Sequence, residues 1–178
     1  MGQILTIGHS THELEAFVDL LRGQGVQALA DVRRYPSSRR MPWFGAAPLA
    51  AGLGGAGIEY VHLPELGGRR DPMPGSPNGG WRVGQFQGYA DHMASDEFAA
   101  VLRKLEALAR ERRTAAMCAE AQWWRCHRRL LSDALLARGW EVVHVDARGG
   151  TEPHSLTEFA VVEGERVTYP PAQAALDV

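Results

Sequence analysis

The sequence predicts a single α/β domain: a three-layer sandwich around a mostly parallel sheet of about five strands, with a small C-terminal hairpin. Short apolar runs alternate along the chain with segments whose apolar residues recur every three to four positions, as in βαβ units. The 178 residues are 45% hydrophobic and 22% charged, which fits one domain over residues 1–178 with a sizeable core.

Three strands and one clear helix are expected in the first part of the chain. Gln3–Gly8 is a short apolar run typical of a buried strand. Ser10 followed by Glu13 is a capping-box pattern that predicts the start of a helix, and Gly23 with Gly25 predicts its end. Residues 28–32 and 58–63 are expected as the second and third strands. The stretch between them should stay irregular from 33 to 48.

The second part alternates in the same way after a long loop. Residues 64–84 contain four prolines and six glycines, which predicts a loop without regular structure. A strong amphipathic helix begins at Ser95, strand four is expected at 114–118, and another helix runs from about Arg125 to Arg138. Strand five is expected at 140–146. Residues 159–162 and 166–169, separated by Glu-Gly-Glu, form a hairpin signal.

The composition points away from membranes and secretion. The sequence has no apolar run of the ~18–20 residues that a membrane span needs. Residues 1–8 enter a strand directly, without the basic flank or cleavage site of a signal peptide. We therefore expect a cytoplasmic protein without a membrane partner, in which Cys118 and Cys126 are reduced thiols.

Arginine dominates the basic residues, although the net charge is only −2. Of the 19 basic residues 18 are Arg, and many occur in clusters such as Arg33-Arg34, Arg39-Arg40 and Arg69-Arg70. Guanidinium groups bind carboxylates and phosphates bidentately, so clusters in loops after strands favour an anion site. A preference for Arg codons explains the overall usage equally well.

Polar side chains follow every expected strand of the sheet. Ligands bind beyond the carboxyl ends of the strands in open parallel sheets, so this convergence predicts one functional pocket at that edge. The residues are His9, Ser10 and Thr11 after strand one; Asp31, Arg33, Ser38 and Arg39 at strand two; Glu65 after strand three; Cys118, Glu120, Cys126, His127 and Arg128 after strand four; and His144 and His154 at and after strand five.

The same segments carry a family resemblance. TIGHST at 6–11, DVRRYPSSR at 31–39, LPELGG at 63–68, CAE at 118–120 and CHR at 126–128 resemble the bacterial and archaeal family known as domain of unknown function 488. The resemblance extends to about His154 and implies a small cytoplasmic α/β protein with these motifs as its signature. It implies no substrate and no catalytic roles.

Cys118, Glu120, Cys126, His127 and His9 are the candidate catalytic residues. A cysteine near a helix N-terminus and beside cations is activated, which suits Cys126, whereas packing of two small apolar residues explains both cysteines as well. Metal binding by the cysteines with His127 and His9 or His144 is a third interpretation. Against it, there is no Cys-x-x-Cys pair, and neighbouring Cys126 and His127 would point ~100° apart on a helix.

An anion is the predicted ligand of the second group of residues. These candidate substrate-binding residues are Ser10, Thr11, Asp31, Arg33, Ser38, Arg39, Glu65 and Arg128. They favour an enzyme, a hydrolase or transferase, that acts on a nucleotide or nucleic-acid component. Alternatively, Asp31 and Glu65 pair with Arg33 and Arg39 as a buried ionic network.

Two other functions stay open. The first is a non-catalytic nucleic-acid-binding domain that uses the Arg loops and the nearby aromatic residues at 43, 44, 81, 123 and 124. The second is a thiol or metal sensor, which requires the two cysteines to be in contact or to share an ion. The sequence has no Gly-rich phosphate loop, and neither cysteine is followed by the five residues and Arg of cysteine phosphatases. Cofactor and oligomeric state are left open.

Overall fold

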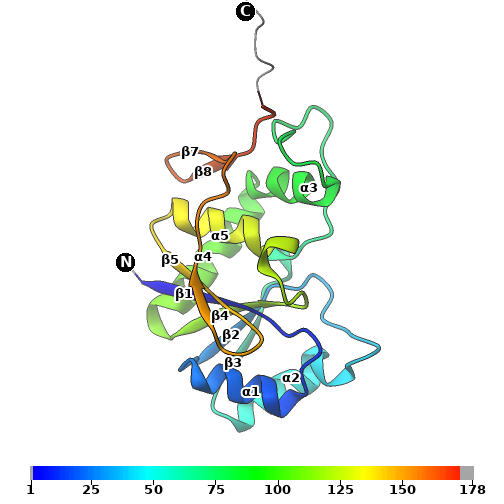
Figure 1. The fold of residues 1–178 in the computed structure, drawn as a ribbon, viewed down its shortest axis with the longest axis vertical. Coiled ribbons are helices and arrows are strands. Elements are labelled where there is room, and N and C mark those ends of the chain that lie inside the picture. The colour runs from blue at the N-terminus through cyan, green and yellow to red at the C-terminus, as the bar shows by residue number, and fades with distance from the viewer. Residues whose placement is uncertain (1, 173–178) are drawn as a thin grey trace, which may run out of the picture.

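The fold is a mixed α/β sandwich around a mostly parallel sheet, as predicted. A computed structural model describes residues 2–172 (Figure 1). Its main sheet has the strand order β3-β2-β4-β1-β5-β6, in which only β6 is antiparallel to its neighbour. The strands are β1 (Gln3–Gly8), β2 (Ala28–Asp31), β3 (Glu59–His62), β4 (Thr114–Cys118), β5 (Glu141–Val145) and β6 (Thr151–Pro153), and the hairpin is β7 (Val161–Glu163) with β8 (Arg166–Thr168).

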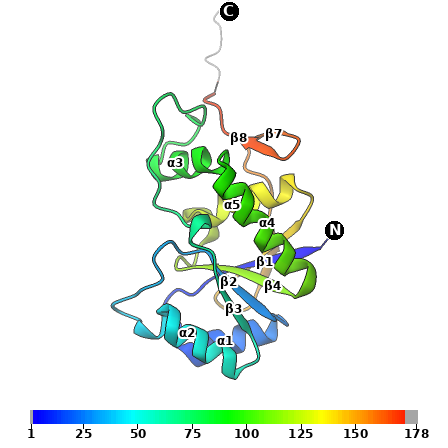
Figure 2. The same cartoon turned by 180° about the vertical axis from the view of Figure 1, so that it is seen from behind.

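Helices cover both faces of the sheet. They are α1 (Leu14–Gly23), α2 (Ala46–Gly55), α3 (Gly84–Met93), α4 (Asp96–Glu111) and α5 (Arg128–Ala137). α1 and α2 lie on one face, and α3, α4 and α5 on the other (Figures 1 and 2). The connections to β2 and β3 run toward one edge of the sheet and those to β4 and β5 run back, so right-handed crossovers place their helices on opposite faces. None of the described helices is long and apolar enough to cross a bilayer.

Each face of the sheet has its own hydrophobic core, because successive strand residues point to opposite sides. Ile4 belongs to the core beneath α4 and α5, where it is joined by Leu102 and Leu131. The next residue, Leu5, belongs to the core beneath α1 and α2, which includes Phe17 and Leu53. Alternate side chains of β1 therefore contribute to both hydrophobic cores.

Three local predictions need correction. The capping box at Ser10 does not form: α1 begins at Leu14 after Glu13, without a side-chain cap, and Ser10 has a φ of 47°. The region predicted as irregular up to residue 48 contains the start of α2 at Ala46, since a proline in the first helical turn costs no intrahelical hydrogen bond. β6 was not predicted because it has only three exposed residues and ends in Pro153, which suits a sheet edge.

Asp91 organises the long loop that the glycines and prolines predict. Its Oδ1 accepts hydrogen bonds from Ser76 Oγ at 2.6 Å and Asn78 Nδ2 at 2.7 Å, and its Oδ2 accepts one from Met73 N at 2.8 Å. Asn78 Oδ1 in turn accepts from the backbone of Tyr169. The loop is therefore fastened to α3 and to the segment after β8, although it has almost no regular structure of its own.

Candidate functional site

A cleft of about 510 Å³ lies at the carboxyl ends of β1, β2 and β4. This edge of the sheet is where parallel strands place ligand sites, and the sequence predicts the pocket there. Of the predicted site residues, those that line it are His9, Ser10, Thr11, Arg33, Ser38, Cys118, Glu120, Cys126 and His127. Asp31, Arg39, Glu65 and Arg128 are not among its lining residues.

Arg128 holds the sulfur of Cys126 from below the cleft. The backbone N and the Nε of Arg128 donate to Cys126 Sγ at 3.3 and 3.4 Å, and Nη2 donates to the carbonyl of Glu120 at 2.6 Å. Arg128 is fully buried and does not line the cleft, so it does not contact a substrate anion there, contrary to its prediction as a substrate-binding residue. No carboxylate pairs with it within residues 2–172. The other acceptors of its guanidinium are Thr6 Oγ1 and the carbonyls of Glu120 and Ala121, so Cys126 is the ionisable group among its hydrogen-bond partners in the described chain. Because buried charges are normally paired, this contact favours the thiolate of Cys126.

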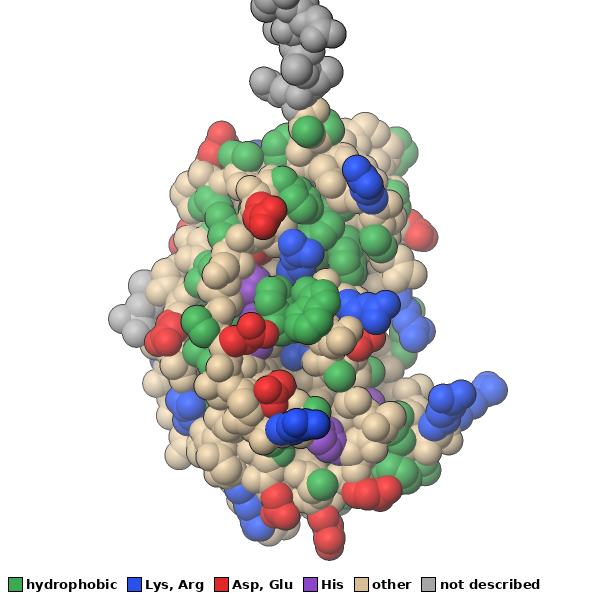
Figure 3. All heavy atoms as spheres, in the orientation of Figure 1, with side chains coloured by type: hydrophobic (Ala, Val, Ile, Leu, Met, Phe, Trp, Pro, Cys, Tyr) green, Lys and Arg blue, Asp and Glu red, His purple; other side chains and the backbone are tan. Residues whose placement is uncertain are grey.

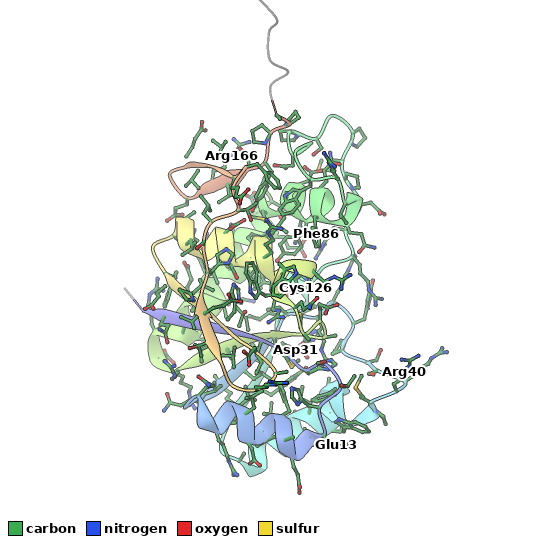
Figure 4. All side chains as sticks on the ribbon, viewed as in Figure 1. Glu13, Asp31, Arg40, Phe86, Cys126 and Arg166 are labelled. Atoms are coloured by element: carbon green, nitrogen blue, oxygen red, sulfur yellow. The ribbon has the colours of Figure 1, made fainter. Side chains whose placement is uncertain are left out.

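The two cysteines are in contact, and their acidities differ. Cys118 Sγ lies 3.1 Å from Cys126 Sγ, and both are free thiols. Burial and the neighbouring Cys126 raise the pKa of Cys118 well above its usual value. Burial opposes ionisation of Cys126 too, but the contact with the Cys118 thiol and the positive charge and hydrogen bonds of Arg128 bring the pKa of Cys126 below that of an ordinary cysteine. Cys126, labelled in Figure 4, is therefore the more acidic thiol of the pair.

Asp31 fixes Arg33 in the wall of the cleft. Its two carboxylate oxygens accept from Arg33 Nε at 2.8 Å and Nη2 at 2.7 Å, and Tyr60 OH donates to Oδ2 at 2.6 Å. Asp31 is completely buried, so it contacts Arg33 rather than a ligand. Half of the predicted ionic network is therefore present: the pair Asp31 and Arg33 forms, whereas neither Glu65 nor Arg39 takes part in it.

Both ring nitrogens of His9 are occupied. A carbonyl only accepts, so the 2.9 Å contact of Nδ1 with the Ser10 carbonyl places the proton on Nδ1. Nε2 then accepts from Arg33 Nη1 at 3.3 Å. Burial, together with the positive charge of Arg33, lowers the pKa of His9 to about 4, despite the opposing bond to Ser10. His9 lines the cleft as a neutral ring stacked on Phe44, 4.2 Å between centroids, and has no free lone pair for proton transfer.

His127 keeps one nitrogen free. Its Nε2 donates to the Val32 carbonyl at 2.8 Å, which leaves the lone pair on Nδ1. Burial lowers the pKa of His127, so the ring is neutral near pH 7. A Cβ at Gly68 would lie 3.0 Å from Nδ1, and one at Gly67 would lie 2.5 Å from Arg34 N. The paired glycines of LPELGG are thus needed so that this loop can approach both residues.

Arg39 and Glu65 lie outside the cleft. Arg39 is exposed on the loop after β2, and the neighbouring Arg40 projects away from the body of the protein in Figure 4. Glu65 contributes only its backbone carbonyl, which accepts from His92 Nε2 at 2.7 Å and Arg70 Nη2 at 3.2 Å. Sequence order alone places both residues after strands, but the loop directions carry their side chains elsewhere.

Three further arginines line the cleft that were not singled out as site residues. They are Arg34, Arg69 and Arg125. The Arg34 guanidinium donates to the Arg69 carbonyl at 2.9 Å, which joins the loops after β2 and β3. The sequence could have indicated them: Arg34 lies in DVRRYPSSR, Arg69 follows LPELGG, and Arg125 precedes Cys126. Basic side chains also spread over the face in Figure 3.

The aromatic residues of the loops mostly act as anchors. Phe44 and Trp81 are buried, Trp43 Nε1 donates to the His12 carbonyl, and Trp123 stacks on His144 at 4.1 Å between centroids. Trp124 remains 46% exposed. The aromatic residues therefore offer no continuous stacking surface of the kind that single-stranded nucleic acid would use.

A buried polar network lies behind the cleft. Asp133 accepts from His154 Nε2 at 2.8 Å and from Tyr169 OH at 2.7 Å, and His154 Nδ1 contacts His144 Nε2 at 2.9 Å. His144 Nδ1 contacts Thr6 Oγ1 at 2.6 Å. Thr6 Oγ1 also accepts from Arg128 Nη1 at 3.4 Å. His144 and His154, placed by the sequence at the pocket edge, belong to this network rather than to the cleft lining.

The described residues contain no group of three or more His, Cys, Asp or Glu side chains that could hold a metal ion. Cys118 and Cys126 contact each other, but His127 Nε2 is occupied by the Val32 carbonyl and His9 by Ser10 and Arg33.

Gly8 lets β1 end against the loop that follows β4. A Cβ there would lie 1.9 Å from the Glu120 carbonyl oxygen, so Gly8→Ala must displace the backbone beside Cys118. We expect this variant to lose about 1–3 kcal/mol in the free energy of unfolding, measured by urea denaturation. The control is Gly54→Ala on α2, where nothing lies within 4 Å, and which should be neutral or gain up to about 1 kcal/mol. Equal stability of the two variants would contradict this role of Gly8.

The comparison with known families agrees with the motifs. The family described as "Domain of unknown function DUF488" matches residues 13–135, more than half of the chain. The chain belongs to this family. The matched segment contains the motifs at 31–39, 63–68, 118–120 and 126–128, whereas TIGHST at 6–11 precedes it. No curated protein and no solved structure matches the chain.

Proposed function

We propose that this protein is an enzyme in which the Cys126 thiolate attacks a substrate that is held through a phosphate group. The substrate class is a nucleotide or a component of nucleic acid. The observation that carries the proposal is the position of Cys126 Sγ: it borders the cleft and is held by a buried guanidinium that has no carboxylate partner in the described part of the chain. A stabilised thiolate that substrate can reach is the requirement for covalent cysteine catalysis.

The walls of the cleft suit an anion. Arg33, Arg34, Arg69 and Arg125 line it, and Glu120 is the only carboxylate residue among the described lining residues. Guanidinium groups bind phosphate oxygens through charge-assisted, bidentate hydrogen bonds. Since the Cys-x5-Arg loop of cysteine phosphatases is absent, we assign phosphate the role of a binding handle, and the atom attacked by sulfur lies elsewhere in the substrate.

The reaction that this arrangement supports is a displacement through a covalent intermediate. Cys126 Sγ forms a bond to the electrophilic atom, and the leaving group departs with the electron pair and takes up a proton. That proton comes from solvent, because Cys126 attacks as a thiolate. Glu120 and the free Nδ1 of His127 are the lining groups that can accept a proton in the release step that follows. Water or a second substrate then releases the product, which makes the enzyme a hydrolase or a transferase.

Backbone strain at the same place supports a functional role. Ser10 and Arg69 are the non-glycine residues of the described chain with left-handed φ angles, 47° and 60°, and both line the cleft. Such conformations are costly and concentrate at functional sites. They place the Ser10 backbone and the Arg69 side chain on opposite loops of one site.

One further observation supports a base next to the bound phosphate. Tyr35 is 58% exposed, and the Arg34 guanidinium lies 5.5 Å from the centre of its ring, at the mouth of the cleft. An exposed aromatic ring next to Arg can stack a base that adjoins the bound phosphate. Binding through several phosphates would weaken steeply with salt, whereas a single nucleotide would respond weakly.

Protection of Cys126 from alkylation tests the proposal. Iodoacetamide labelling at pH 7 is measured with inorganic phosphate, nucleoside 5′-monophosphates or short single-stranded oligonucleotides present. We expect the nucleotides or oligonucleotides to slow labelling, and Arg69→Ala to weaken that protection about tenfold through loss of a charge-assisted hydrogen bond. Arg39→Ala, on the same surface but outside the cleft, should protect like the parent protein. Unchanged labelling with every phosphate compound would refute the phosphate-bearing substrate.

A further inference from the structure

Cys118 has no role in the displacement described above, yet its position beside Cys126 is specific. It ends β4, is 3% exposed, and its Sγ lies 3.1 Å from the Cys126 sulfur that borders the cleft. A small shift would bring the two sulfurs to the ~2.05 Å of a disulfide bond. Cys126 is therefore accessible to substrate, and the buried Cys118 lies in contact with it.

The two thiols also differ in acidity, and the accessible one is the more acidic, as disulfide exchange requires. The accessible Cys126 is the thiolate, and burial together with the Cys126 charge raises the pKa of Cys118. The positive charge of Arg128 acts in the other direction on Cys118. Once Cys126 becomes part of a disulfide, its negative charge disappears, and Arg128 then favours ionisation of Cys118. The second thiol is thus activated only after the first has reacted.

We propose that Cys126 and Cys118 form a dithiol couple that reduces disulfides bearing anionic groups. The proposal rests on the accessible thiolate of the proposed function but needs no phosphate chemistry. Arg33, Arg34, Arg69 and Arg125 around the cleft provide the preference for an anionic partner. The chemical class of substrate is a low-molecular-weight or peptide disulfide with carboxylate or phosphate groups near the sulfurs.

The exchange proceeds in two balanced steps. Cys126 Sγ⁻ attacks one sulfur of R–S–S–R, the S–S bond breaks, and R–S⁻ leaves and is protonated by solvent. Cys118 then loses its proton and attacks Cys126 Sγ, which expels the second R–S⁻ and forms the Cys118–Cys126 disulfide. The dithiol gives up two electrons and the substrate becomes two thiols. An external dithiol reductant restores the pair by the reverse exchange.

The test follows the cysteine products by mass spectrometry with three disulfides of different charge. Glutathione disulfide is the anionic probe, 2-hydroxyethyl disulfide the neutral one and cystamine the cationic one. We expect the parent protein to form the internal disulfide, Cys118→Ser to accumulate a mixed disulfide on Cys126, and Cys126→Ser to form neither. The anionic probe should react about tenfold faster than the cationic one at low salt. Arg69→Ala should reduce this preference, and Arg39→Ala should retain it.

The outcomes separate this proposal from the previous one. A parent protein that stops at the mixed disulfide overturns the dithiol couple, and one that reacts faster with cystamine overturns the anionic class of substrate. If nucleotides nevertheless protect Cys126 from alkylation, the proposed function survives on its own. Exchange that runs as expected without any protection by phosphate compounds overturns only the phosphate-bearing substrate. A Cys126 that iodoacetamide cannot alkylate at pH 7 overturns both.

Discussion

Arg128→Met is expected to slow the alkylation of Cys126 by iodoacetamide at pH 6.5 by about tenfold to a hundredfold. The thiolate is the reacting species, and one unit of pKa corresponds to about 1.36 kcal/mol, or a tenfold change in thiolate population below the pKa. Arg128 is the buried cation that donates to Cys126 Sγ, so its removal should move the pKa of this thiol upward. The measurement is the alkylation rate across pH 5 to 10.

The direction of the pH effect is defined by the lowered pKa of Cys126. The parent protein should stay reactive well below the usual thiol range of about 8.5, and lose reactivity only as the pH falls through the lowered value. In Arg128→Met the inflection should move to higher pH. Arg128→Lys keeps the charge without the guanidinium fork and should recover part of the rate. Identical profiles for the parent and Arg128→Met would show that Arg128 does not sustain the thiolate.

Asp133→Ala is expected to reduce the free energy of unfolding by about 3–5 kcal/mol, because it leaves several buried donors without an acceptor. Asp133 is fully buried and accepts from His154 Nε2, the Thr157 backbone N and Tyr169 OH. Urea denaturation measures the loss. Asp19→Ala on α1, at a side chain that is 73% exposed, is the control and should change stability by less than about 0.5 kcal/mol. A loss below about 1 kcal/mol for Asp133→Ala would mean that water replaces the missing carboxylate.

Local periodicity was sufficient to predict the parallel strands and most helices. β1 was predicted within a residue or two because burial on both faces makes it a continuous apolar run, and α4 because burial of one face spaces its apolar residues at helical intervals. Where tertiary contacts decide, the prediction failed: Ser10 has a capping pattern, but the turn between β1 and α1 uses it in a left-handed conformation beside the cleft. β6 forms because it pairs with β5, and the sequence of its three residues alone does not predict a strand.

The pocket was predictable at the level of the sheet edge, but not at the level of contacts. Strand order was open from sequence, so the adjacency of β1, β2 and β4 could not be derived. The contact between Cys118 and Cys126 depends on the short 3-10 turn Trp123–Arg125, which folds the chain back after β4. Arg128 was assigned to substrate because it follows a strand, whereas its helix position turns it inward beneath the thiolate.

The central position of β1 in the sheet shows that the segment matched by the family does not contain the whole fold. The matched segment starts at residue 13, yet β1 lies between β4 and β5 in the middle of the sheet. The segment also ends at residue 135, before His154 and Tyr169, which satisfy Asp133 from outside it. A polypeptide trimmed to 13–135 would leave the buried strand β4 without its partner β1, as an open edge that is a template for aggregation. The part of the chain that identifies the family is therefore smaller than the unit that folds, and protein intended for the assays above needs the flanking strands.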